Sequence, residues 1–193
     1  MQKAGSSSQG TKNSGNGAPF LTDVATLRQR ARQGMQAGAV TPSYGLDPKV
    51  VVDVLNVALA TEIVCVLRYK NHYFMAQGLA SESVKSEFAE HAAEEQQHAD
   101  RLAERIVQLG GEPDLDPETL TERSHSEYKS GKSLTDMLRE DLVAERIAIE
   151  SYREIVEWLH GKDPTSKRMM EEILANEEEH AEEISSLLAG MKD

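Results

Sequence analysis

Cysteine is almost missing from this sequence, which contains only Cys65. One thiol excludes an intrachain disulfide framework, and it also excludes four-cysteine zinc or rubredoxin-type modules. The start of the sequence lacks the apolar run of a signal peptide, and no stretch approaches the length of a membrane span. We therefore expect a soluble cytoplasmic protein in a reducing compartment, without a membrane partner.

Glycine and proline are scarce beyond residue 45, where they fall mainly in short stretches between longer segments. Those longer segments are rich in Glu, Ala, Leu and Ile, which favour helix. Of the 193 residues, 39% are hydrophobic and 28% are charged, so the chain needs no second hydrophobic core. The composition predicts an all-α fold in one compact domain plus some additional chain.

Positive charge is also unevenly distributed. The formal net charge is -12, but residues 1–45 carry +4 and the remainder -16. We predict a flexible basic N-terminal arm over 1–45 and a helical domain over 46–193. Within the arm, residues 1–19 are expected to be disordered, and Thr22 to about Met35 to form a short basic amphipathic segment with apolar residues at helical spacing. An acidic domain repels nucleic acid, so DNA binding is expected to be weak or absent and to run through the arm.

Helical periodicity and capping residues predict four long helices. Their approximate ranges are 48–77, 81–109, 134–160 and 164–189. Residues 112–132 contain two prolines and are long enough for a crossover, with a short helix around 118–128. Because this crossover lets the second and third helices run parallel, the pattern predicts an antiparallel four-helix bundle with two short connections and one long one.

Each predicted helix has a glutamate near its middle. These residues are Glu62, Glu95, Glu145 and Glu177. The second and the fourth begin a Glu-x-x-His step with His98 and His180, while the other two stand 33 and 32 residues upstream. A tyrosine follows each upstream glutamate by seven residues, at Tyr69 and Tyr152. Mid-helix positions of an antiparallel bundle meet in one layer, so four carboxylates and two imidazoles should converge.

Such a convergence calls for metal ions. Four carboxylates in an apolar bundle repel one another, and each suffers a desolvation cost of several kcal/mol. Two divalent cations would cancel their charge. Carboxylate and imidazole ligands without thiolate suit iron or manganese and also admit zinc. We therefore predict a dinuclear metal site with two ions per chain.

The Glu-x-x-His step alone is a weak signal in so acidic a chain. Glu122 with His125 and Glu157 with His160 match it too. These two pairs lie in the crossover and at a helix end, and they have no partner in the repeat. We therefore expect them to be surface residues.

Several other side chains near the predicted centre have more than one expected role. His91 is expected to be a satisfied core histidine, a partner of the ligands or an extra ligand. Glu94 is expected to guide ions or to remain solvated. Cys65 either faces the centre or fills the core, and Trp158 is expected to pack in the core. The two tyrosines are expected to donate hydrogen bonds to the carboxylates.

With these motifs in place, residues 46–190 resemble the ferritin-like superfamily. Bacterioferritins and Dps-like mini-ferritins with a bacterioferritin-type di-iron centre are the most similar members. The resemblance implies that the catalytic and metal-binding residues are Glu62, Glu95, His98, Glu145, Glu177 and His180. Glu95 and Glu177 would bridge the metals. It also implies two iron ions per subunit, oxidation of Fe(II) by oxygen or hydrogen peroxide, and storage of the mineral in a hollow shell of identical subunits.

Two features depart from that family. Bacterioferritins bind haem through a methionine directly after the first motif glutamate, whereas this chain has Gln96. We therefore do not expect haem. The sequence ends 13 residues after His180, which is too few for the fifth helix of 24-subunit ferritins. A homo-oligomeric shell of 12 subunits is favoured.

Other functions would use the same features. A manganese catalase or an oxygenase would need the same ligand set. A Dps-like shell would protect DNA through the basic arm. A helical interaction protein would need no metal at all. The sequence favours a ferroxidase that stores iron and limits peroxide damage.

Overall fold

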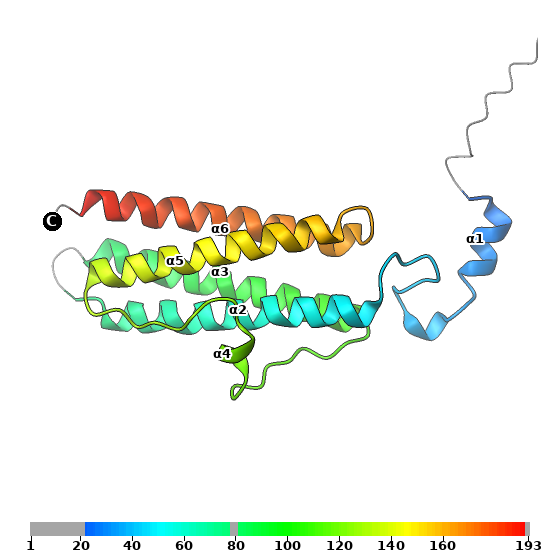
Figure 1. The fold of residues 1–193 in the computed structure, drawn as a ribbon, viewed down its shortest axis with the longest axis horizontal. Helices are drawn as coiled ribbons and strands as arrows, with labels where there is room; N and C mark the ends of the chain where they lie inside the picture. The colour runs from blue at the N-terminus through cyan, green and yellow to red at the C-terminus, as the bar shows by residue number, and fades with distance from the viewer. Residues whose placement is uncertain (1–21, 78–80, 192–193) are drawn as a thin grey trace, which may run out of the picture.

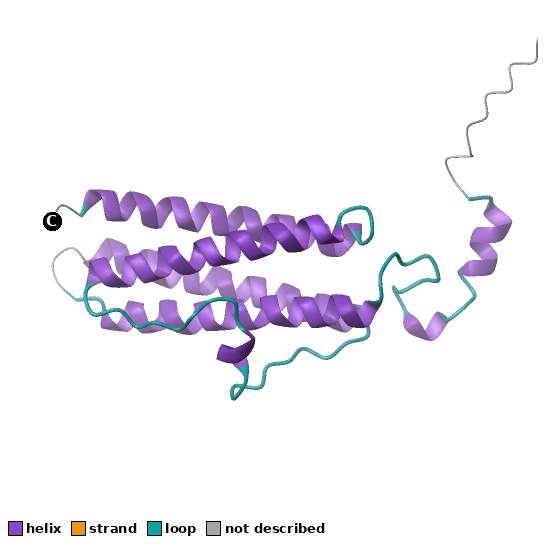
Figure 2. Cartoon of the chain, viewed as in Figure 1, coloured by secondary structure: helices purple, strands orange, loops and turns teal. Residues whose placement is uncertain are grey.

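The computed structural model describes residues 22–77 and 81–191, so the predicted disorder of residues 1–19 lies outside the described residues. Within the described ranges the chain is helical, without β-strands (Figures 1 and 2). The four long helices are α2 (Pro48–Met75), α3 (Ser81–Gln108), α5 (Leu134–Leu159) and α6 (Pro164–Gly190). Three short elements accompany them: α1 (Val24–Arg30), the 3-10 helix η1 (Met35–Ala37) and α4 (Leu120–Arg123). The all-α prediction is confirmed.

Capping side chains begin three of the long helices where the sequence indicated. Asp47 accepts a hydrogen bond from the amide of Lys49, and Ser133 accepts one from Asp136. Asp163 accepts from the amides of Thr165 and Ser166. Each cap satisfies amides that have no partner within the helix. The predicted ends of the long helices agree with the structure to within two residues.

The long helices form two hairpins that pack on each other. Helix α2 packs on α3, and α5 packs on α6 (Figure 1). Two apolar clusters fill the bundle. The first includes Leu55, Leu59, Leu102, Ile106, Leu159, Met170 and Ile173. The second includes Phe88, Ala92, Leu138 and Ile184. Each fully buried large side chain contributes about 1.5–3 kcal/mol. In all four helices, the polar residues predicted to bind metal fall between these two clusters.

The crossover between α3 and α5 runs beside α2 (Figure 1). Thr61 of α2 accepts a hydrogen bond at 3.0 Å from the amide of His125. The predicted helix over 118–128 is too long, because only α4 is helical there. Beyond α4, the Ser124 hydroxyl accepts from the amide of Ser126 and donates to its carbonyl. Such local side-chain bonds replace helical hydrogen bonds.

The predicted amphipathic segment before α2 is helical only in part. The chain forms α1 and then η1, separated by Gly34 in a left-handed conformation with φ of 62°. No residue of α1 is buried. The hydroxyl of Tyr44 donates to Asp163 Oδ2 at 2.5 Å, which fixes the end of this segment to the start of α6.

Helix α2 contradicts the expectation that no stretch of the sequence approaches the length of a membrane span. By length and composition alone it is apolar enough to cross a membrane, and 61% of that apolar stretch is buried inside the bundle. It is apolar on most sides because it contacts α3, α4 and α5. The core helix of a water-soluble protein has the same character, so this feature is weak evidence for a membrane span.

Candidate metal centre

The six residues predicted to bind metal lie together in the middle of the bundle. Helix α2 supplies Glu62, α3 supplies Glu95 and His98, α5 supplies Glu145, and α6 supplies Glu177 and His180. We call these six residues the Glu–His centre. None of them is more than 3% exposed. The repeat in the sequence therefore corresponds to one buried cluster.

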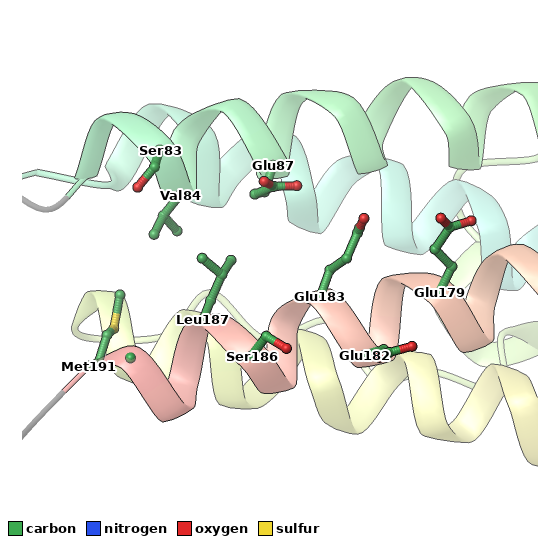
Figure 3. A pocket seen from close by; sticks show the side chains of 10 residues that line it. Ser83, Val84, Glu87, Glu179, Glu182, Glu183, Ser186, Leu187 and Met191 are labelled. Atoms are coloured by element: carbon green, nitrogen blue, oxygen red, sulfur yellow. The ribbon is translucent and has the colours of Figure 1, made fainter.

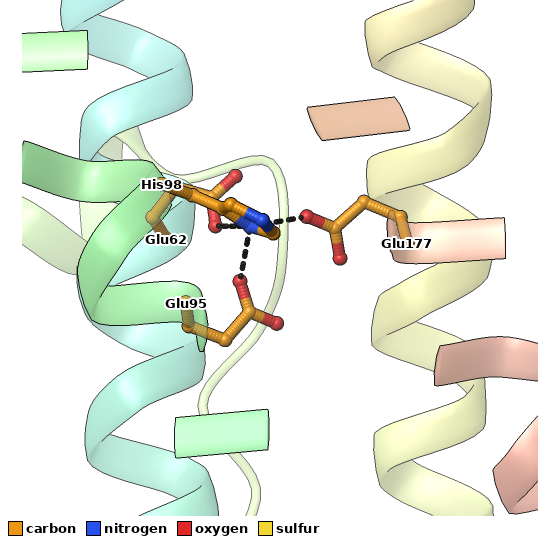
Figure 4. A group of neighbouring side chains, drawn as sticks. All are labelled: Glu62, Glu95, His98 and Glu177. Atoms are coloured by element: carbon orange, nitrogen blue, oxygen red, sulfur yellow. Dashed lines mark ion pairs between the residues drawn. The ribbon is translucent and has the colours of Figure 1, made fainter. Parts of the chain in front are cut away.

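The centre consists of two overlapping groups of ligand atoms. One group contains Glu62, Glu95, His98 and Glu177 (Figure 4). The other contains Glu95, Glu145, Glu177 and His180. Within each group, one ligand atom from every residue lies within 4.8 Å of the others. Because Glu95 and Glu177 belong to both groups, they are placed to bridge two ions.

Most of the charged atoms in the centre have no hydrogen-bond partner. In the described part of the chain, nine buried side-chain nitrogen and oxygen atoms lack one. Eight of the nine belong to the Glu–His centre, and the ninth belongs to Asn71. Since buried polar atoms are normally paired, this concentration needs an explanation. Divalent cations fit it, because they would accept the lone pairs of every carboxylate and imidazole concerned.

The charges within the centre also shift one another's pKa. Burial, followed by the carboxylates of Glu62 and Glu145, raises the pKa of Glu95 well above its usual range. Burial and Glu95 raise the pKa of Glu177 to about 8. A protein without metal therefore retains protons on these carboxylates at neutral pH. Bound cations would displace those protons.

The imidazoles face the carboxylates at close range. His98 Nδ1 lies 3.0 Å from Glu177 Oε1, and His180 Nδ1 lies 3.6 Å from Glu177 Oε2. Burial opposes the charged form of His180, but Glu145 and Glu177 outweigh it and raise its pKa to about 12. Burial likewise opposes the charged form of Glu145, but contacts with His180 and Glu177 outweigh it and lower its pKa to about 2.

The two tyrosines hold the carboxylates in a crossed arrangement. Tyr69 of α2 donates its hydroxyl hydrogen to Glu145 of α5, and Tyr152 of α5 donates to Glu62 of α2. Burial raises the pKa of both phenols well above the usual value, so both are neutral donors. Each hairpin thus orients the terminal carboxylate of the other hairpin.

The outer nitrogens of His98 and His180 also have side-chain partners. Glu94 Oε2 lies 2.6 Å from His180 Nε2, and Asn176 Oδ1 lies 3.4 Å from His98 Nε2. Such partners orient an imidazole toward a metal. Glu94 therefore contacts His180 of the Glu–His centre, rather than being only a solvated side chain. The role of Asn176 was not predicted, although it stands next to Glu177 in the sequence.

A second buried charged group was missed by the sequence analysis. Arg68 and His72 on α2 pair with Asp141 on α5, each at 2.8 Å. We call these three residues the Asp141 cluster; all are 0% exposed. Cys65 packs here, with its sulfur 3.4 Å from an Arg68 nitrogen. The signal was present, because Arg68 and His72 are spaced i, i+4 and therefore share one face of α2.

The remaining candidates behave as the sequence indicated. Both extra Glu-x-x-His pairs are exposed on the surface, and neither belongs to a group of metal-ligand atoms among the described residues. These are Glu122 with His125 and Glu157 with His160. Trp158 is partly buried against the first apolar cluster.

Comparison with known proteins identifies the family. The model of the ferritin-like domain matches residues 52–193. Bacterioferritin of Brucella melitensis is 32% identical over 145 residues, which is 74% of this chain and 84% of that protein. The DNA protection during starvation protein of Pyrococcus furiosus is 30% identical over 76% of this chain and 80% of its own length. One similar solved structure is a dodecameric thioferritin, the bacterioferritin-related protein of Bacteroides fragilis. It is 36% identical in sequence and has a TM-score of 0.73. The match covers 76% of this chain and 88% of that one.

Proposed function

The chain belongs to the ferritin-like family, and from this we propose that it is a ferroxidase that oxidises Fe(II) and stores the product as a mineral. The observation that carries the proposal is the set of eight buried, unpartnered ligand atoms in the Glu–His centre. A structural cluster would satisfy these atoms with hydrogen bonds, whereas here they approach one another only as ion pairs, at 3.0–3.9 Å. A binding site for cations leaves them free to coordinate.

The residues divide into bridging and terminal positions. Glu95 and Glu177 would contact both ions, because each belongs to both groups of ligand atoms. Glu62 with His98 would complete one position, and Glu145 with His180 the other. All ligands are oxygen or imidazole nitrogen, which suits iron, with manganese or zinc as substitutes. Two bound iron ions per chain are therefore proposed.

The proposed reaction removes one electron from each Fe(II). Hydrogen peroxide accepts two electrons and two protons to give two water molecules, and oxygen accepts four of each. Carboxylates suit the change because they bind Fe(III) as well as Fe(II). The protein keeps those carboxylates in place through Tyr69 and Tyr152. It orients His180 through Glu94.

We also propose that the active form is a cytoplasmic shell of twelve identical subunits. The dodecameric Bacteroides fragilis relative supports this size. The thiol of Cys65 is free and buried, which is compatible with a reducing compartment. Haem is not proposed, because Gln96 offers no thioether and instead donates its side-chain amide to Asp100.

The deciding experiment combines metal counting with product analysis. Protein freed of metal with a chelator is titrated with Fe(II) without oxygen, and about two ions per chain should bind tightly in the Glu–His centre. Oxygen or peroxide is then added, and a mineral core should appear by electron microscopy. Rapid oxygen evolution from peroxide without a mineral would instead identify a manganese catalase-like enzyme. Tight binding of no metal would leave a helical interaction protein.

A second candidate function follows from the exposed basic arm. Helix α1 buries none of its residues and carries Arg28 and Arg30 in its last turn. We propose at most weak, salt-sensitive DNA binding, because the rest of the chain is strongly acidic. Twelve arms on one shell would strengthen it through avidity. A gel shift that survives physiological salt and disappears on deletion of residues 1–35 would support DNA protection as a main function.

A further inference from the structure

Outside the Glu–His centre, one further group of metal-ligand side chains lies between α3 and α6 in the ranges that the structure describes. It consists of Glu87 and His91 on α3 and Glu183 on α6, with one ligand atom from each within 4.8 Å of the others. His91 Nε2 lies 2.9 Å from a Glu183 oxygen and 3.9 Å from a Glu87 oxygen. One imidazole nitrogen with two carboxylates is a suitable donor set for a divalent transition metal.

The hydrogen bonding of His91 determines which nitrogen faces this group. Tyr69 donates its only hydroxyl hydrogen to Glu145, so its oxygen has lone pairs left. His91 Nδ1 lies 3.3 Å from that oxygen and is therefore the donor. In the neutral ring, this tautomer leaves a lone pair on Nε2. That lone pair faces two carboxylates that also offer only lone pairs, and a cation between them would satisfy all three groups.

The ring of His91 is held in place before any ion binds. It is 1% exposed and stacks on the ring of His180, with centroids 4.1 Å apart and planes 20° from parallel. The two rings are also oriented alike. Each turns Nδ1 toward the interior and Nε2 toward a carboxylate on the outside, Glu183 for His91 and Glu94 for His180. A fixed ligand lowers the entropy cost of binding an ion.

An acidic pocket gives solvent access to the group. It has a volume of about 700 Å³, and its carboxylates are Glu87, Glu179, Glu182 and Glu183. In Figure 3, Glu183 points from α6 toward α3, where Glu87 lies on the facing helix. Four carboxylates around one opening raise the local concentration of cations.

We propose that Glu87, His91 and Glu183 form a third cation site, which takes a divalent transition-metal ion such as Zn²⁺, Fe²⁺ or Mn²⁺. His91 Nε2 and one oxygen from each glutamate are the ligand atoms. None of the three residues belongs to the Glu–His centre. The site therefore holds an ion whether or not the centre performs redox chemistry.

The test uses zinc, which is redox-inert, and the full-length protein in its native assembly. Bound zinc is counted after equilibrium dialysis and located by anomalous diffraction. The parent protein should show two peaks in the Glu–His centre and a third beside His91 Nε2. The double variant Glu87→Gln/Glu183→Gln should lose the third peak and one zinc ion per chain. It leaves the buried imidazole stack untouched.

The matched control is Glu179→Gln/Glu182→Gln, which removes the same charge from the same pocket and should retain all three ions. Equal zinc loss in both double variants would show that zinc is attracted only by the general negative charge of the pocket, and it would overturn the proposal. A parent crystal with a filled centre but no peak at His91 would also overturn it, leaving only an ion pair. Glu95→Ala should lose the central pair while keeping the His91 peak, which separates this proposal from the ferroxidase proposal.

Discussion

Two of the buried charged groups in the described part of the bundle are built in opposite ways. In the Asp141 cluster, Arg68 and His72 each contact one carboxylate oxygen at 2.8 Å, and His72 Nε2 also lies 3.1 Å from the carbonyl of Lys129. None of its atoms is among the unpartnered ones. In the Glu–His centre, eight atoms are unpartnered. The same interior thus contains one ionic network whose polar atoms all have partners, and another whose carboxylate and imidazole atoms would be satisfied only by bound cations.

This difference separates stability from function. A paired buried charge becomes strongly destabilising when its partner is removed, because the remaining charge has no compensation. Mutually repelling carboxylates behave in the opposite way, because removal of one relieves repulsion. The Asp141 cluster should therefore determine whether the chain folds well. The Glu–His centre should determine what the folded chain binds.

The largest expected effect is on oxidation. Glu95→Ala or Glu177→Ala removes a carboxylate that belongs to both ligand groups, so paired metal binding should be lost. The rate of Fe(II) oxidation should fall at least about 100-fold, or about 3 kcal/mol of transition-state stabilisation. Denaturant unfolding of the metal-free variants should show unchanged or increased stability. Stopped-flow absorbance and metal analysis provide the measurements.

Matched controls for that prediction come from the two surface motifs. Glu122→Ala and Glu157→Ala remove the glutamate of a Glu-x-x-His step outside the repeat, and both should oxidise Fe(II) at the parent rate. Parent-like oxidation by Glu95→Ala, with two metals still bound per chain, would show that the proposed ligand set is wrong.

The next largest effect is on folding. Asp141→Ala leaves Arg68 and His72 buried without their carboxylate, and the free energy of unfolding should fall by about 3–5 kcal/mol. The measurement is urea unfolding of the metal-free protein. Glu150→Ala, on the exposed side of α5, is the control and should change it by less than about 0.5 kcal/mol. If the metal-free Asp141→Ala variant were as stable as the parent, the Asp141 cluster would not stabilise the fold, and the proposed difference between the two groups would be wrong.

The dependence on pH is expected to be smaller per pH unit than the effect of Asp141→Ala. The pKa of Glu177 is raised to about 8 and that of His180 to about 12, so the folded metal-free protein holds protons that the unfolded chain releases. The stability from Glu177 is present at low pH and is lost as pH rises from about 4.5 to about 8, and that from His180 is lost from about 6.5 to about 12. The metal-free protein should therefore lose stability between pH 5.5 and 8.5, by about 1.4 kcal/mol per pH unit for each proton that the folded state holds in excess.

Metal should reverse this dependence. Cations replace the retained protons, so the zinc-loaded protein should become more stable with rising pH over the same interval. Thermal unfolding at pH 5.5, 7 and 8.5, with and without zinc, tests both slopes. A metal-free protein that gains stability between pH 5.5 and 8.5 would contradict the assigned pKa directions.

The smallest effect is expected at the tyrosines. Tyr152→Phe removes one hydrogen bond to Glu62 and should lower the stability of the metal-free protein by about 1 kcal/mol. Tyr69→Phe should lower it more, because His91 Nδ1 loses its partner as well. Both variants should still bind two zinc ions in the Glu–His centre, as anomalous diffraction would show. Equal stabilities for the two variants would argue against the hydrogen bond between His91 and Tyr69.

Much of this arrangement could be predicted because its signals are local or repeated. Asp47 and Asp163 each stand directly before a proline, and this combination indicates a helix start. The six residues of the centre recur at matching intervals, so two weak motifs support each other. Their convergence then follows from the mid-helix level that they share.

The features that were missed depend on contacts between distant residues. Asp141 lies 73 residues from Arg68, and neither residue type distinguishes a buried pair from a solvated one. His91 could be placed near the centre, but the rotation of α3 that stacks it on His180 depends on how the two hairpins pack. The length of the crossover helix was overestimated, because Ser124 and Ser126 form hydrogen bonds with each other in a turn that the composition does not predict.

The crossed tyrosine bonds repeat the same contact in both directions between the two hairpins. Tyr69 reaches Glu145, Tyr152 reaches Glu62, and each hairpin contributes one lone glutamate and one Glu-x-x-His step. Each hairpin therefore carries half of the six residues, together with the tyrosine hydroxyl that donates a hydrogen bond to the other hairpin. An isolated hairpin could reproduce this chemistry only by pairing with a second copy of itself. In such a symmetric dimer, both hydrogen bonds and both bridging carboxylates would arise from a single sequence.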